Sequence, residues 1–423
     1  MAFDTRAVSG EVSAPSVSLR HPLAIAIACF TIWGLAYGLL DVLNKHFQDT
    51  LHVGKAQSTW LQMAYFGAYL LLSVPAGVLL QKRGYKAGIV SGLLITAVGA
   101  LLFIPSAQAG SFTFFVGSMF VLAAGLCVLE TAADTYVSVL GPAEHAPRRL
   151  NLAQSFNALG VFCGPLIGGF LFFAEAKEGV SGQGAVQVTY LVIAVAVLVF
   201  AAVVWRARLP ETGDRELTGF GHDEVETPGG AQSLWSHRHF VLGVVTQALY
   251  IGAQVGIGAF FINLVTETWP GLSSRDGAFM LSIATAGYLG GRFATTAMLL
   301  KVSPRAILTA YGLINLALCL VVAAGIEKVS AVALIATFLF MGAMFATIFT
   351  LGIADLGGST KRGASMMVMA IGGGVLLPYP MGLIAEAYGV PAAFLLPAVS
   401  FAAVALYGWV GSAVRPANRT CAE

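Results

Sequence analysis

The sequence predicts an all-α integral membrane protein with twelve transmembrane helices in two bundles of six, and three observations support this fold class. Of the 423 residues, 57% are hydrophobic and 10% are charged, and the mean hydropathy is +0.81. A soluble globule of this size needs more polar surface. From Pro22 onward, apolar runs of about 20 residues recur, each long enough to cross a bilayer as a helix. A polar stretch near the middle divides these runs into two equal sets.

The apolar runs define the order of the elements. We expect spans at residues 23–47, 58–80, 88–107, 112–140, 150–174, 187–206, 239–266, 276–300, 305–325, 330–356, 363–388 and 391–413. The predicted domains are therefore an N-terminal tail at 1–21, a first bundle at 22–206, a linker at 207–239, a second bundle at 240–414 and a C-terminal tail at 415–423.

The distribution of lysine and arginine predicts the orientation. If both ends are cytoplasmic, 17 of the 23 basic residues fall in inner segments, 5 fall in outer segments, and Arg292 lies within a helix. Cytoplasmic loops carry the excess of basic residues in membrane proteins. Both termini are therefore predicted to lie in the cytoplasm.

The two predicted bundles share a sequence repeat. A basic residue is followed by a glycine 11 positions later and a proline 16 positions later, first at Arg149, Gly160 and Pro165 and again at Arg362, Gly373 and Pro378. Two similar six-helix halves related in this way are the parallel repeat of a major facilitator transporter. In that fold the substrate is held between the halves, near the midplane of the membrane.

Two carboxylates lie inside the fourth predicted span. No charged residue occurs between Lys86 and Glu130, and Asp134 follows Glu130 by one helical turn. Glu130 lies about 15 Å from the inner end of its helix, near the middle of a hydrocarbon layer about 30 Å thick. An ionisable group at this depth typically marks an ion or proton route, although hydrogen bonding to a neighbouring helix is the structural alternative. We predict that Glu130 and Asp134 take part in proton coupling.

Asp41 lies on the first predicted span, about 27 Å along the helix and toward its outer end. Two interpretations are open from spacing alone. The carboxylate is either a proton carrier that faces the outer vestibule or one partner of an interfacial ion pair with Lys45, one turn later.

Polar side chains on two further spans are candidates for solute binding. Gln154 and Asn157 share one face of the fifth span. On the seventh span Tyr250 and Gln254 are one turn apart, and Asn263 lies further out. Amides offer both donors and acceptors, as a neutral hydroxyl-rich solute requires. The alternative is hydrogen bonding between helices, commonly worth about 0.6 kcal/mol in membranes.

Several stretches together resemble the fucose permease family of major facilitator sugar/proton symporters. They are residues 33–48 around Asp41, 129–141 (LETAADTYVSVLG), 149–160 (RLNLAQSFNALG), 250–256 (YIGAQVG), 291–293 and 347–374. The resemblance implies a proton-coupled sugar importer in which Asp41 and Glu130 match the two essential carboxylates of the family. It also implies that Gln154 and Asn157 line the cavity.

The chain departs from that family at positions near these carboxylates. Asp134 and the residue after it replace the usual Asn-Pro, while Tyr37, Gly38 and Leu40 stand where the fucose permease itself has asparagines. Gly258 occupies a position where the family often has tryptophan. Tyr37 remains a candidate solute contact. These replacements remove polar and aromatic side chains that could contact a sugar, which favours a solute other than fucose. The open alternatives are a different sugar, an amino sugar, a disaccharide or a non-sugar metabolite.

The predicted function is secondary active transport, namely proton-coupled import of a small polar solute such as a sugar or sugar derivative. The alternative is a proton-coupled exporter of a metabolite or siderophore-like chelator, because the same carboxylates serve both directions. No catalytic constellation, metal-ligand spacing or basic nucleic-acid-binding tract occurs in the sequence. We therefore expect no enzyme activity, cofactor, metal or nucleic-acid partner, and a monomer in the inner membrane of a bacterium.

Overall fold

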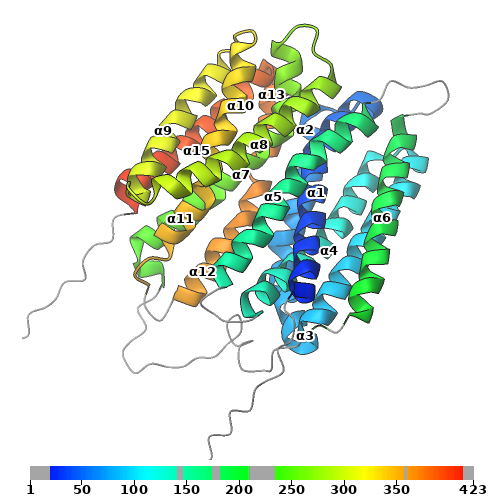
Figure 1. Ribbon diagram of the computed structural model, residues 1–423. Helices are drawn as coiled ribbons and strands as arrows, with labels where there is room; N and C mark the ends of the chain where they lie inside the picture. Colours follow the sequence, from blue (N-terminus) through cyan, green and yellow to red (C-terminus); the bar gives the residue numbers. More distant parts are fainter. Residues whose placement is uncertain are drawn as a thin grey trace, which may run out of the picture.

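The computed structural model describes residues 20–140, 146–173, 182–207, 209, 234–356 and 360–412, and its regular elements are all helices (Figure 1). The first half contains α1 (Arg20–Leu51), α2 (Lys55–Ser58), α3 (Trp60–Ala109), α4 (Phe112–Val139), α5 (Ala146–Phe172) and α6 (Gly182–Arg206). The second half contains η3 (Leu234–Ser236), α7 (Arg238–Thr268), α8 (Ser274–Met298), α9 (Pro304–Ala323), α10 (Val329–Met341), α11 (Met344–Gly352), α12 (Thr360–Met369), η5 (Ala370–Val375), α13 (Pro378–Tyr388), α14 (Val390–Ala393), α15 (Leu395–Leu406) and η6 (Tyr407–Gly411). The predicted tails and most of the predicted linker lie outside the described residues.

Helix α3 is two spans joined at a sharp reversal. Its two apolar parts are Lys55–Leu80, which includes α2, and Lys82–Ala109. Between them Gly84 has φ 77° and ψ 174°, a conformation that costs glycine little because glycine has no Cβ. The basic turn around Gly84 marks the inner end of the first half. We call the opposite end of the helices the outer end.

The described helices make twelve crossings. Eleven of them are apolar enough to be recognised as spans by composition alone. Helices α10 and α11 together form one of these spans, and the segments Met366–Tyr388 and Val390–Gly411 each form another. The twelfth crossing is α8, which is long enough at 25 residues but carries Arg275, Asp276 and Arg292. The predicted class, an all-helical protein with twelve crossings, is confirmed.

Helix boundaries differ from the predicted ones by a few residues at most ends. The first helix continues to Leu51 rather than ending at residue 47, so Asp41 lies deeper than we predicted. The tenth span is broken between Met341 and Met344, where Gly342 packs against the backbone of Tyr288. Helix α8 begins with a capping box in which Ser273 and Asp276 bond to each other's backbone N–H groups.

Glycines bring α1 and α5 into direct backbone contact. A Cβ on Gly34 would lie 2.0 Å from the carbonyl oxygen of Asn157, and one on Gly164 would lie 2.4 Å from the carbonyl carbon of Gly38. Small residues one turn apart let transmembrane helices approach closely. A Cβ on Gly38 would lie 2.5 Å from the Val161 carbonyl oxygen, so this crossing requires a glycine at position 38, which can carry no polar side chain.

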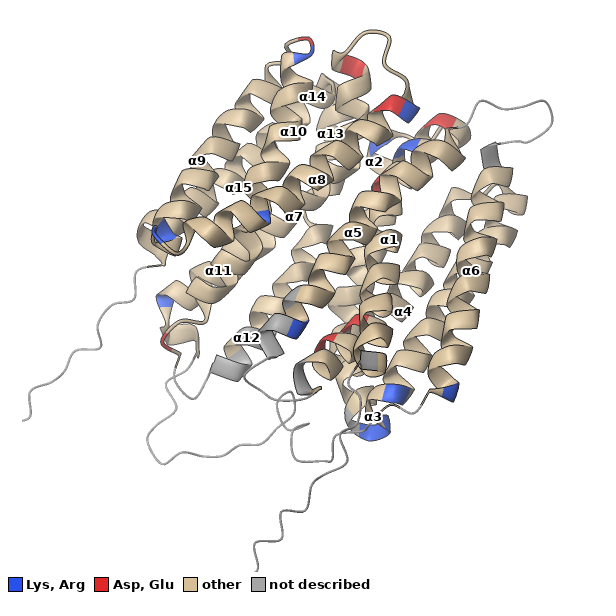
Figure 2. Ribbon diagram, in the orientation of Figure 1, with Lys and Arg blue, Asp and Glu red and all other residues tan. Residues whose placement is uncertain are grey.

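The two halves lie side by side, with α1–α6 on one side and α7–α15 on the other (Figure 1). Lys and Arg lie at the inner end of the first half near α3 and α6, at the inner end of the second half and, in part, at the outer end, while most acidic residues lie at the outer end (Figure 2). This asymmetry agrees with the predicted orientation. Because twelve crossings return the chain to its starting side, the first and last described helices begin and end on the same side.

Candidate functional site

Glu130 lies in the inner part of α4, nine residues before the helix ends at Val139. The half-buried side chain is next to Tyr69 of α3. Glu130 Oε2 and the Tyr69 hydroxyl are both buried, and neither has a hydrogen-bond partner of good geometry among the described residues. A carboxyl group in this setting has little solvent or charge compensation, which is the arrangement expected of a protonatable carrier rather than a structural ion pair.

Asp134 and Gln154 extend this polar region to α5. Asp134 lies one turn after Glu130 on α4, and the Gln154 side chain is next to it. The Asn157 amide nitrogen, one turn further along α5, donates a hydrogen bond to the Phe30 carbonyl of α1 at 3.3 Å. The structure therefore groups Glu130, Asp134 and Gln154, while the Asn157 amide nitrogen also holds α5 to α1.

Asp41 lies between the two halves. Gln62 of α3 donates a long hydrogen bond to its Oδ1 at 3.4 Å. Across the interface the carboxylate packs on Gly258 of α7, where a Cβ would lie only 2.4 Å from Asp41 Oδ2. The ion pair with Lys45 that spacing allowed is not formed, because Lys45 Nζ lies 2.9 Å from Asp49 instead. Gly258 thus makes room for the Asp41 carboxylate.

The polar residues of the seventh predicted span have different surroundings. Tyr37 of α1 lies next to Gln254 and Tyr288 of the second half. The hydroxyl of Tyr250 donates to the Met341 carbonyl at 2.8 Å, and the side chain is fully buried. Tyr37 and Gln254 therefore meet across the interface, whereas Tyr250 bonds within the second half.

Asn263 belongs to a set of contacts that join the halves at their outer ends. Its amide donates to Gln48 Oε1 at 2.5 Å. The other contacts are Asn44 to the Ala259 carbonyl (3.0 Å), Ser274 to Asp49 (2.8 Å), Lys55 to Glu267 (2.5 Å) and the Ala56 N–H to Glu386 (2.9 Å). Because these bonds span the two halves, the molecule is closed at its outer end, and Asp41 lies beneath this closure.

Two residues of the second span, Gln62 and Tyr69, were missed in the sequence. Gln62 contacts Asp41 and Tyr69 lies next to Glu130, so the span reaches both carboxylates. The available signal was a run of polar-tipped side chains, Gln62, Tyr65 and Tyr69, at one-turn spacing in an otherwise apolar segment.

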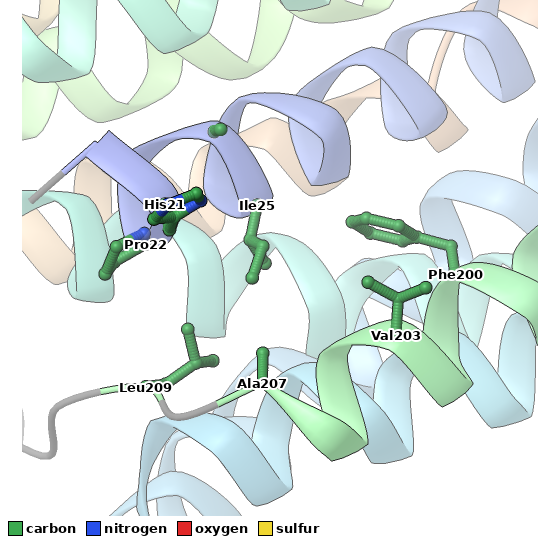
Figure 3. A pocket seen from close by; sticks show the side chains of 8 residues that line it. His21, Pro22, Ile25, Phe200, Val203, Ala207 and Leu209 are labelled. Atoms are coloured by element: carbon green, nitrogen blue, oxygen red, sulfur yellow. The ribbon is translucent and has the colours of Figure 1, made fainter.

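A pocket of about 540 Å³ lies elsewhere, between the inner ends of α1 and α6 (Figure 3). Its lining is apolar apart from His21, with Ile25, Phe200 and Val203 among its walls. None of the candidate site residues lines it. Among the described residues no group of three or more His, Cys, Asp or Glu side chains could hold a metal ion.

Two helical halves that carry carboxylates and amides within their membrane-spanning helices have the architecture of a secondary transporter. The chain belongs to the Major Facilitator Superfamily, whose sequence pattern matches residues 23–375. It is 34% identical over 386 residues to the glucose/galactose transporter of Brucella abortus, a match covering 90% of this chain and 92% of that protein. It is also 34% identical over 408 residues to the L-fucose-proton symporter of Escherichia coli, covering 91% and 92%.

Solved structures agree with this assignment. A crystal structure of the transporter FucP in the outward conformation matches with a TM-score of 0.67 and 32% sequence identity, covering 94% of this chain and 100% of that one. The inward-open xylose transporter XylE of Escherichia coli matches with a TM-score of 0.73 but only 11% identity, covering 95% and 98%, and so shares the fold. The predicted family resemblance is confirmed, and this multi-pass membrane protein belongs to a family of transporters rather than enzymes.

Proposed function

We propose that this protein imports a sugar together with protons by alternating access, with Glu130 as the coupling carboxylate. The observation that carries the proposal is the position of Glu130: within the first half, beside Tyr69 and Asp134, with one buried carboxylate oxygen that has no hydrogen-bond partner of good geometry among the described residues. Moving an ionised carboxylate through a closed, dry state is costly, and protonation removes that cost. Reorientation of the two halves would therefore be linked to proton binding.

The sugar class is supported by the relatives, which are named as glucose/galactose and L-fucose-proton transporters. The amides of Gln154, Asn157 and Gln254 can both donate to and accept from hydroxyl groups. At position 38 the α1/α5 crossing requires a glycine, so α1 offers no polar side chain to a sugar there. We therefore favour a hexose such as D-glucose or D-galactose over L-fucose. We place the protein in the inner membrane of a bacterium, acting as a monomer.

The test is uptake of radiolabelled D-glucose, D-galactose and L-fucose into proteoliposomes under an imposed inward proton gradient. We expect accumulation of a hexose that collapses when a protonophore is added. Emptying of preloaded vesicles under the same gradient would support the export alternative. Uptake unaffected by the protonophore would refute proton coupling.

A further inference from the structure

Gln247 on α7 is a buried amide that the fold does not use. The side chain is 0% exposed, and neither Nε2 nor Oε1 has a hydrogen-bond partner among the described residues. Leaving a buried polar group unsatisfied is destabilising, and such groups are rare in native proteins. An apolar residue of similar size would fill the same space without this cost, so the position of Gln247 on α7 decides whether the amide serves solute binding.

Further out along α7, the face that carries Gln247 meets the first half. Gln254 and Gly258 follow Gln247 by 7 and 11 residues, which places them within about 20° of it around the helix. Gly258 packs on Asp41, and Gln254 lies next to Tyr37. Both of these partners belong to α1, so Gln247 continues the same face toward the inner end of α7.

Gln247 also lies at the depth of the polar groups of the first half. It is nine residues from the inner end of α7 at Arg238, and Glu130 is nine residues from the inner end of α4 at Val139. At 1.5 Å per residue, each is about 14 Å from the inner end of its helix. Gln154, eight residues from the start of α5 at Ala146, is at a similar level.

We propose that Gln247 is a solute-binding residue of the second half, which hydrogen-bonds sugar hydroxyls opposite Gln154; this rests on the sugar function proposed above. Its amide supplies two donors and one acceptor, which suit neighbouring hydroxyls on a sugar ring. Because the side chain is fully covered while the outer end is closed, contact with the sugar requires the second half to move. The sugar then provides the partners that the protein does not.

The proposal predicts opposite effects on stability and on binding. In the purified protein without sugar, Gln247→Leu should raise the thermal unfolding midpoint, because it removes an unpaired buried amide. The same variant should lose most of the stabilisation by D-glucose, D-galactose or L-fucose, with Kd raised at least about tenfold, as expected when a hydrogen-bonding contact is lost. Gln247→Met, with a flexible side chain of similar length, repeats the test if leucine does not pack.

Asn315 on α9 offers a matched control. It is also 0% exposed, and its Nδ2 and Oδ1 also have no partner among the described residues. Helix α9 packs against α10, α11 and α15 of its own half. Asn315→Leu should therefore raise the midpoint while leaving the sugar-induced shift at the wild-type value.

Three outcomes would overturn the proposal. A lower midpoint in both Gln247 variants would identify a structural amide, and a wild-type sugar shift in Gln247→Leu would show that the sugar does not contact it. If none of the sugars changes the thermal unfolding midpoint of the wild-type protein, the proposed sugar function is refuted, and the role of Gln247, which rests on it, is refuted as well.

Discussion

Asp41 shows how far a single residue could be understood from the sequence. The spacing of four residues to Lys45 allowed an ion pair, but Lys45 has a second carboxylate at the same spacing, Asp49, and pairs with it. Spacing along one helix cannot distinguish two such partners, because both lie on adjacent turns. The actual neighbours, Gln62 and Gly258, come from other helices. Only tertiary packing brings them together.

Gly258 provides a prediction at this scale. In Gly258→Ala the new methyl group would lie 2.4 Å from Asp41 Oδ2, so the carboxylate or α7 must shift. We expect transport to fall at least about tenfold at equal expression, because small displacements in a closed interface are costly. The control is Gly287→Ala on α8, where nothing lies within 4 Å of the added Cβ. Equal transport by both variants would contradict a role for this contact.

Gln154 provides a second prediction at the scale of single residues. If it lines a water-filled path from the inner side, Gln154→Cys in a cysteine-free background should react with a membrane-impermeant thiol reagent added from that side. Val195→Cys on α6, whose native side chain is 51% exposed, is the control for a lipid-facing position. A thiol in hydrocarbon does not ionise and so reacts slowly. Equal, slow labelling at both positions would mean that Gln154 packs away from water.

At the scale of helices, apolar run length predicted the elements well, because each span must satisfy its backbone internally. It could not foresee the break between Met341 and Met344, which depends on the close approach of Gly342 to α8. The apolar runs also predicted α8, as the span at residues 276–300, although its polar residues lower its hydropathy below that of the other crossings.

The α1/α5 crossing gives an element-scale prediction. Gly34→Ala places a methyl group 2.0 Å from the Asn157 carbonyl oxygen, and overpacking of this kind typically costs about 1–3 kcal/mol. The thermal midpoint of the purified protein should fall. Gly117→Ala on α4 meets nothing within 4 Å, and alanine favours helix over glycine, so its midpoint should hold or rise. A Gly34→Ala protein as stable as wild type would show that the two helices can separate freely.

For the whole molecule, the sequence repeat predicted two similar halves but could not predict how they meet, since few of the contacts between halves follow a recognisable motif. The bonds between halves at the outer end join residues up to 330 positions apart, as between Ala56 and Glu386. Polar and charged groups such as Lys55 and Glu267 make these contacts at the exposed outer end, where water can replace their partners when the halves separate.

A substitution at Gly382 tests the closure of the two halves at the outer end. A Cβ at this position on α13 would lie 2.4 Å from Ala56 Cα, across the two halves. Gly382→Ala should therefore disfavour the closed outer end. The assay uses Asn263→Cys, a position that is 1% exposed in the closed structure. A membrane-impermeant thiol reagent added from the outer side should label this cysteine about tenfold faster when Gly382→Ala is also present. The control is Gly287→Ala in the same cysteine background. Unchanged labelling would mean that the outer end stays closed without this contact.

Proton coupling is the property of the whole molecule that depends most on one carboxylate. Glu130→Gln imitates the protonated side chain, so the halves should still exchange positions with sugar bound, while the link to the proton is lost. Counterflow of labelled sugar should persist in proteoliposomes, and gradient-driven accumulation should fall to the equilibrium level. Asp134→Asn, one turn away on the same helix, is the matched comparison. If Glu130→Gln still accumulates sugar with normal proton influx, Glu130 serves packing or specificity, and the proton must bind at Asp41 or Asp134.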